Sequence, residues 1–322
     1  MKVKFRNSQS SAKDLIGGSP QGTLLGGLNY IIASFDCDAS EEGCEEEDQF
    51  DYFDDLNMLE LIILTEKLQE YDYLSHVPSD IGVEQMYIPP ESMKMQSYVN
   101  AIQNWSNENM MKINRDKSNF ILFNRSKDDF TTRLTISEDK IDRIPVIKLL
   151  GVWLQEDLGW QENTKQICKK AFSRITLLNK LKYVGIQTED LLTIYKLFIR
   201  CIPEYCSSVF HSSLSEELSN KIERIQSTCL RVILSENYVS YSAALEMCGL
   251  DRLSTRREKR QLSFSLKCLK TEFTKDMFPL NENNKEPFHV NFARTEQYKN
   301  STIPECQRKL NAHFSMKNCF NK

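Results

Sequence analysis

Three short segments contain residues whose types and spacing could support chemistry. They are GGSPQGTLLG at 17–26, YFDDL at 52–56 and NMMKINRDKSNFILF at 109–123. Adjacent carboxylates such as Asp54 and Asp55 are ligands that hard divalent cations prefer, and a glycine-rich stretch lets another molecule approach the backbone closely. Each segment alone is weak evidence, because a Gly-Pro stretch is usually a turn, and an Asp pair or a lone Lys is usually solvated.

Charge is distributed unevenly along the chain, although the formal net charge is only -4. Residues 1–60 contain four basic and thirteen acidic residues, and eleven of the acidic ones lie between Asp36 and Asp55. Residues 161–270 contain eighteen Lys and Arg against eleven Asp and Glu. A carboxylate-rich part suits cations and a basic part suits phosphate, so this pattern favours a protein that handles nucleotides or nucleic acid. Two solvated surfaces of opposite charge are the simpler alternative.

The elements that must position these segments fall into two regions. Before residue 155 the patterns predict a mixed region, with a helix from Ser97 and strands at 120–123, 134–136 and 146–154. Beyond Trp160 the patterns predict long amphipathic helices. One stripe consists of Ile167, Ala171, Ile175, Leu178 and Leu181, and the next helix starts at Thr188 and continues through Leu192, Tyr195, Phe198 and Ile202. Ser213 and Glu216 resemble a capping box ahead of a third helix.

In combination, the order and spacing of these segments resemble the palm of reverse transcriptases encoded by non-LTR retrotransposons of the jockey type. The run at 18–26 resembles that family's GxPQGxxLxP motif, the run at 52–55 its (F/Y)xDD motif, and the run at 114–118 its NxxKT/S element. KLLGVWL at 148–154 is similar to the family's primer grip, and the helical region that follows is similar to its thumb. The resemblance covers roughly residues 3–270 and is specific in combination.

The resemblance implies an α+β fold. A partial right-hand polymerase palm, consisting of a small antiparallel sheet with helices, would occupy residues 1–155, and an all-α thumb would occupy residues 156–270. Residues 271–322 are rich in Pro, Asn and Lys, and this composition predicts an extended C-terminal tail.

The resemblance also implies an RNA-directed DNA polymerase that uses an RNA template, a DNA primer and dNTP. Asp54 would bind Mg²⁺ or Mn²⁺ with Asp55 as its supporter, and Lys117 would approach the leaving pyrophosphate as a general acid or a charge stabiliser. Template and nucleotide would contact Gly18, Ser19, Pro20, Gln21 and Gly22, and the primer end would contact Leu149, Leu150, Gly151, Val152 and Trp153.

Several features depart from the family pattern. The family has a further catalytic Asp on a strand well upstream of the GxPQG motif, but here only sixteen residues precede Gly17 and the sole acidic one among them is Asp14. We therefore expect an N-terminally truncated fragment that lacks useful catalytic rate alone. Gly27 stands where the family usually has Pro, and Phe53 stands where a smaller residue is commoner.

Two other functions remain open. The acidic run places Asp36, Asp38, Ser40, Glu42 and Glu47 at the ligand positions of a twelve-residue calcium loop, but position six is Glu41 where that loop requires Gly. A non-catalytic nucleic-acid binder is the stronger alternative, because the basic segment at 161–270 suits phosphate whether or not chemistry occurs.

Composition argues against several classes of protein. No apolar run reaches the roughly 18 to 20 residues that a membrane span requires, and the first residues lack the apolar core of a signal peptide. The ten cysteines are scattered singly from Cys37 to Cys319 without a CxxC pair, and there are only four histidines. Reduced thiols are therefore expected in place of a disulfide framework or structural zinc, and we predict a cytoplasmic and nuclear protein that is not secreted.

Overall fold

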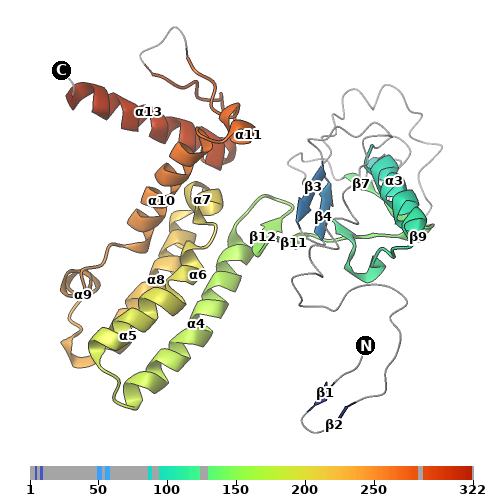
Figure 1. Ribbon diagram of the computed structural model, residues 1–322. Coiled ribbons are helices and arrows are strands. Elements are labelled where there is room, and N and C mark those ends of the chain that lie inside the picture. The colour runs from blue at the N-terminus through green and yellow to red at the C-terminus, as the bar shows by residue number, and fades with distance from the viewer. Residues whose placement is uncertain are drawn as a thin grey trace. The chain divides into compact units, whose positions relative to one another are not determined.

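The computed structural model describes residues 94–123, 130–281 and 286–320, together with five short strands nearer the N-terminus (Figure 1). Those strands are β1 (Lys4–Phe5), β2 (Ser8–Gln9), β3 (Gln49–Tyr52), β4 (Asp55–Met58) and β5 (Met86–Ile88). The chain divides into two compact units, Met1–Ile144 and Pro145–Lys322.

The first unit contains the amphipathic helix α3 (Lys94–Glu108). Its residues Tyr98, Val99 and Ile102 are buried, as expected for a helix with one apolar side. The sequence predicts this helix from Ser97, and the helix begins three residues earlier. The Gln96 side chain pairs with the backbone of Thr135, because its Nε2 donates to the carbonyl oxygen at 3.0 Å and its Oε1 accepts from the amide at 3.0 Å.

The strands of the described residues pair only two by two. Antiparallel pairs join β1 to β2, β3 to β4, β8 (Thr135–Ile136) to β9 (Asp139–Lys140), and β11 (Val146–Leu149) to β12 (Val152–Gln155). Parallel pairs join β5 to β7 (Phe130–Thr132) and β6 (Asn119–Phe120) to β10 (Asp142–Arg143).

Two strand predictions were wrong in extent. The strand expected at 120–123 is only Asn119–Phe120. The strand expected at 146–154 is a hairpin, because Leu149 pairs with Val152 and the chain reverses at Leu150 and Gly151. Both turn residues have positive φ, which a continuous strand cannot accommodate.

Within the described residues of the second unit, the regular structure is helical apart from the hairpin of β11 and β12 and one isolated bridge between Leu280 and Phe288. Its longest helices are α4 (Gln161–Tyr183), α8 (Glu216–Leu234), α10 (Leu253–Cys268) and α13 (Thr302–Phe320). The shorter ones are α5 (Thr188–Ile194), η5 (Tyr195–Ile199), α6 (Cys201–Glu204), α7 (Ser207–Phe210), η6 (His211–Ser213), η7 (Ser235–Asn237), α9 (Tyr241–Met247), α11 (Glu272–Lys275) and α12 (Glu296–Lys299).

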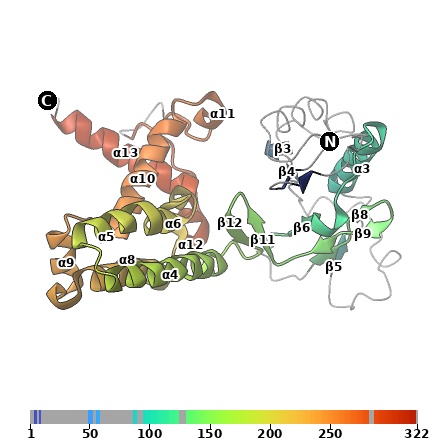
Figure 2. The ribbon, with the colours of Figure 1, turned by 60° about the horizontal axis from the view of Figure 1, so that its bottom comes forward.

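The main core of this unit lies between α4, α5 and α8, which run side by side in both views (Figures 1 and 2). Helix α4 contributes Ala171, Ile175 and Leu178, as its predicted stripe requires, and Ile167 and Leu181 flank them. Helix α8 contributes Ile222, Ile225, Cys229, Leu230 and Ile233, all fully buried. Each fully buried large aliphatic side chain stabilises the unit by about 1.5–3 kcal/mol relative to its exposed state.

Two helical details differ from the predictions. Tyr195 and Ile202 are buried as predicted, but Leu191 and Ile199 complete the buried stripe. Leu192 is only half-buried and Phe198 is 58% exposed. Residues 195–199 form a π-helical turn in which the Arg200 amide bonds the Tyr195 carbonyl at 2.9 Å, and this wider turn changes the residues that face the core. The cap of α8 is Ser215, whose Oγ accepts from the Leu218 amide at 3.3 Å.

The prediction of an extended tail over residues 271–322 was wrong for its last part. Thr302–Phe320 forms α13, and its residues Cys306 and Leu310 share a buried cluster with Cys268, Phe278 and Phe288. The prediction counted Pro304 as evidence against a helix. Pro304 lies in the first turn of α13, where the missing amide hydrogen removes no helical hydrogen bond.

The fold is therefore mostly helical with a few small two-stranded sheets, and it is α+β in this broad sense. Among the helices of the described residues, none is long and apolar enough to cross a membrane.

Candidate nucleic-acid interface

The predicted primer-grip residues form the hairpin of β11 and β12. Leu150 and Gly151 connect the strands and have φ values of 46° and 88°. Positive φ at both central residues is the requirement of a type I′ turn, whose twist matches that of the two strands. Glycine meets this requirement at the second position without strain. The sequence thus brings all five predicted primer-grip residues into one turn and its flanking strand positions.

Tyr205 holds the turn of this hairpin. Its hydroxyl donates to the Leu150 carbonyl oxygen at 2.7 Å. Its ring lies so close to Gly151 that a Cβ at that position would be 3.2 Å from Tyr205 Cε1. The turn is therefore fixed by one hydrogen bond, and the Tyr205 ring would have to shift slightly to accommodate a Cβ at position 151.

The other end of the hairpin is attached to the first turn of α4. The Trp153 amide donates to Oδ1 of the buried Asn163 at 3.2 Å. The Glu162 amide donates to Gln155 Oε1 at 2.7 Å. The strand residue Gln155 therefore accepts a hydrogen bond from one of the backbone amides that have no partner within the first turn of the helix. The hairpin therefore keeps a fixed orientation on the helical unit.

Three side chains of the hairpin could contact another molecule. Lys148 is exposed, and its Nζ lies 6.0 Å from the centre of the half-buried Trp153 ring. Leu150 is 47% exposed at the turn. A cation beside an aromatic ring and an apolar tip suits the phosphates and bases at the end of a nucleic-acid strand.

Replacement of Gly151 by alanine is expected to lower the free energy of unfolding by about 1–2 kcal/mol. The first reason is that φ of 88° strains any residue with a Cβ. The second is that the new methyl group would press against the Tyr205 ring. Urea denaturation followed by circular dichroism measures the change.

Gly185→Ala is the matched control for this change. Gly185 has a similar φ of 92°, but a Cβ there would meet nothing within 4 Å. Gly185→Ala should therefore show the backbone strain alone. A Gly151→Ala variant as stable as Gly185→Ala would contradict a close contact between the hairpin turn and Tyr205.

The predicted catalytic residues lie in the other unit. Asp55 is the first residue of β4 and pairs with Tyr52 of β3, so Asp55 stands at one end of a two-stranded antiparallel ladder. Asp54 itself lies outside the described residues, as do Gly18, Ser19, Pro20, Gln21 and Gly22. Among the described residues, no group of three or more His, Cys, Asp or Glu could hold a metal ion.

Lys117 is exposed in the short helix η4 (Arg115–Lys117). The Asn114 carbonyl oxygen accepts from the Lys117 amide at 3.2 Å and from Ser118 Oγ at 3.0 Å. Asn114, Lys117 and Ser118 of the predicted NxxKT/S element therefore form hydrogen bonds within one local turn. Lys117 and Asp55 belong to the unit Met1–Ile144, and the hairpin of β11 and β12 belongs to the unit Pro145–Lys322.

The sequence analysis missed an arginine cluster around Glu204, the last residue of α6. Glu204 is only 4% exposed. Arg256 bonds it through Nε and, at 3.3 Å, through Nη2. Arg260 Nη2 bonds it at 2.8 Å, and Arg200 Nε lies 3.8 Å from it. The signal available in the sequence was the run TRREKR at 255–260, which places two arginines four residues apart on one helix face.

A second polar cluster contains Arg257 of α10, Ser219 of α8 and His211 of η6. Arg257 is fully buried and donates through Nη2 to Ser219 Oγ at 3.0 Å, and its burial lowers its pKa. Burial lowers the pKa of His211 to about 4, and the charges of Arg257 and Lys309 act in the same direction. His211 is therefore neutral at pH 7, and this cluster carries its positive charge on Arg257.

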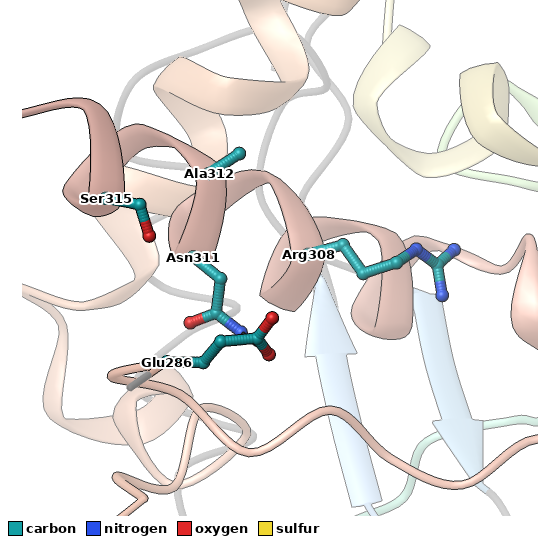
Figure 3. A pocket seen from close by; sticks show the side chains of 5 residues that line it. All are labelled: Glu286, Arg308, Asn311, Ala312 and Ser315. Atoms are coloured by element: carbon teal, nitrogen blue, oxygen red, sulfur yellow. Dashed lines mark hydrogen bonds between the residues drawn. The ribbon is translucent and has the colours of Figure 1, made fainter. Parts of the chain in front are cut away.

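A pocket of about 230 Å³ lies beside α13 and is lined by Glu286, Arg308, Asn311, Ala312 and Ser315 (Figure 3). Asn311 Nδ2 donates to Glu286 Oε2 at 3.2 Å and to the Phe288 carbonyl at 2.9 Å. Its Oδ1 accepts from the Phe288 amide at 2.8 Å. The side-chain amide of Asn311, which faces this pocket, thus attaches the segment with Glu286 and Phe288 to α13.

Comparison of the chain with protein-family models, with curated proteins and with solved structures finds no match.

Proposed function

We propose that this chain derives from the palm and thumb of a reverse transcriptase of a non-LTR retrotransposon, and that it binds an RNA template paired with a DNA primer. The observation that carries the proposal is the primer-grip-like hairpin, whose turn is held by Tyr205 and whose end is attached directly to α4. The order of the three motifs before this hairpin and the basic helical region after it support the same assignment.

The proposed descent from a reverse transcriptase implies nucleotidyl transfer as the activity. The pairing of Asp55 with Tyr52 at one end of the ladder of β3 and β4 supports this proposal. Asp54 and Asp55 would hold Mg²⁺ or Mn²⁺, which would activate the primer hydroxyl and neutralise the triphosphate. Lys117, exposed in η4, would supply positive charge to the leaving pyrophosphate. Gly18, Ser19, Pro20, Gln21 and Gly22 would contact the template and the incoming dNTP.

Nucleic-acid binding without catalysis is the second candidate function. The arginine cluster around Glu204 favours it, because this cluster offers positive charge to phosphate independently of any metal site. The two candidates share the same primer–template partner and differ in whether chemistry follows binding.

Primer extension separates the two candidates. The full chain is incubated with a DNA primer annealed to an RNA template, dNTPs and Mg²⁺ or Mn²⁺, and the products are resolved by length. Any extension should be lost in Asp54→Asn and kept in Asp51→Asn, which removes the same charge from β3. Extension that is equal in Asp54→Asn would contradict the polymerase assignment. Binding without extension supports the second candidate, and neither binding nor extension contradicts both.

A further inference from the structure

The arginine cluster around Glu204 contains more positive charge than the fold needs. Arg200, Arg256 and Arg260 surround a single carboxylate, so three positive charges face one negative charge. One arginine would suffice to neutralise the buried Glu204, and each additional guanidinium adds repulsion between like charges. Asp251 lies nearby, but its carboxylate is 2.7 Å from Lys259 Nζ and is already paired.

The cluster is also rigid and partly accessible. Glu204 is 4% exposed, while the side chains of Arg256 and Arg260 are 27% and 51% exposed. A guanidinium has five N–H donors in a fixed plane. Arg260 reaches Glu204 through Nη2, so the rest of its donor plane can meet phosphate oxygens in solvent. Because the buried carboxylate already restrains these side chains, less conformational entropy is lost when an anion binds.

The position of the cluster favours nucleic acid over an acidic protein. Glu204 is followed directly by Tyr205, which bonds the turn of the primer-grip-like hairpin through the Leu150 carbonyl. The same chain segment therefore anchors the arginines and the hairpin. A strand whose end contacts the hairpin would have backbone phosphates near this segment.

We propose that Arg256 and Arg260, held in place by Glu204, form a phosphate-binding site for the backbone of the primer–template duplex. Arg200 adds charge behind them, with a side chain that is only 18% exposed. This inference rests on the proposed function and adds to it the residues that contact the nucleic-acid backbone. The site reads charge and phosphate geometry and does not read base sequence.

The test measures binding of a fluorescently labelled DNA primer annealed to RNA by anisotropy, with the full chain and at several salt concentrations. Arg260→Ala should weaken binding about 5- to 10-fold and reduce the slope of log K against log salt by about 1. Arg260→Lys keeps the charge without the planar fork, so it should retain the slope and lose part of the affinity.

Lys259→Ala is the matched control, since it removes one positive charge from the neighbouring position, where Lys259 pairs with Asp251. It should leave the affinity within about twofold of the unmodified chain, as expected for a residue without a phosphate contact. If the unmodified chain binds and Arg260→Ala binds as well as Lys259→Ala does, the phosphate site is wrong while the proposed function stands. If the unmodified chain does not bind at all, the proposed function itself fails. If poly-glutamate bound as tightly as the primer–template duplex, and Arg260→Ala weakened that binding too, the partner of the cluster would be an acidic protein and the nucleic-acid assignment would be overturned.

Discussion

Replacement of Glu204 by alanine is expected to lower the free energy of unfolding by about 3–5 kcal/mol, which is a large part of the stability of most domains. The change would leave Arg200, Arg256 and Arg260 close together without their shared counter-charge. It would also remove hydrogen bonds that join α6 to α10 across more than fifty residues of sequence. Urea denaturation followed by circular dichroism at 222 nm measures the loss.

Glu217→Ala is the control for this prediction. Glu217 also pairs with a cation, since its Oε1 lies 2.6 Å from Lys221 Nζ, but its side chain is 75% exposed. Solvent screens such a pair, so its removal should cost much less than the loss of Glu204. If Glu204→Ala were no more destabilising than Glu217→Ala, the carboxylate would not hold the arginines as described.

The helices of the second unit could be predicted from sequence because their pattern is local. The stripe of Ala171, Ile175 and Leu178 repeats at helical spacing, and the same spacing defines the core face of α8. The π-helical turn at 195–199 could not be predicted, since no residue type marks it, and it moved Phe198 out of the core. Local propensity identified the helices, whereas the exact buried face depended on packing.

The interface was only partly predictable for a similar reason. In KLLGVWL the apolar run from Leu149 to Leu154 is interrupted only by Gly151, which suggests a single strand, and Leu150 is an unusual residue for the positive φ that the hairpin turn requires. Of the three arginines around Glu204, Arg200 alone lies near it in sequence, four residues before it. Tyr205 bonds Leu150, and Glu204 bonds Arg256, across more than fifty residues of sequence. Contacts of this kind arise from tertiary packing, which spacing along one chain segment does not encode.

The second large effect is expected in nucleic-acid binding. Three phosphate contacts displace about three counterions, and the affinity should then fall by at least about 40-fold when salt rises from about 50 to about 200 mM. The basic region at 161–270, with eighteen Lys and Arg, can supply these contacts. The acidic residues between Asp36 and Asp55 do not favour phosphate, so a weak salt dependence would point to binding through another surface.

The most direct test of the account is therefore the equilibrium affinity of the full chain for an RNA template annealed to a DNA primer, measured by anisotropy across that salt range. The account predicts saturable binding whose log K falls linearly with log salt, with a slope of about -3 or steeper. Absence of binding at about 50 mM salt, or an affinity that does not change with salt, would contradict it.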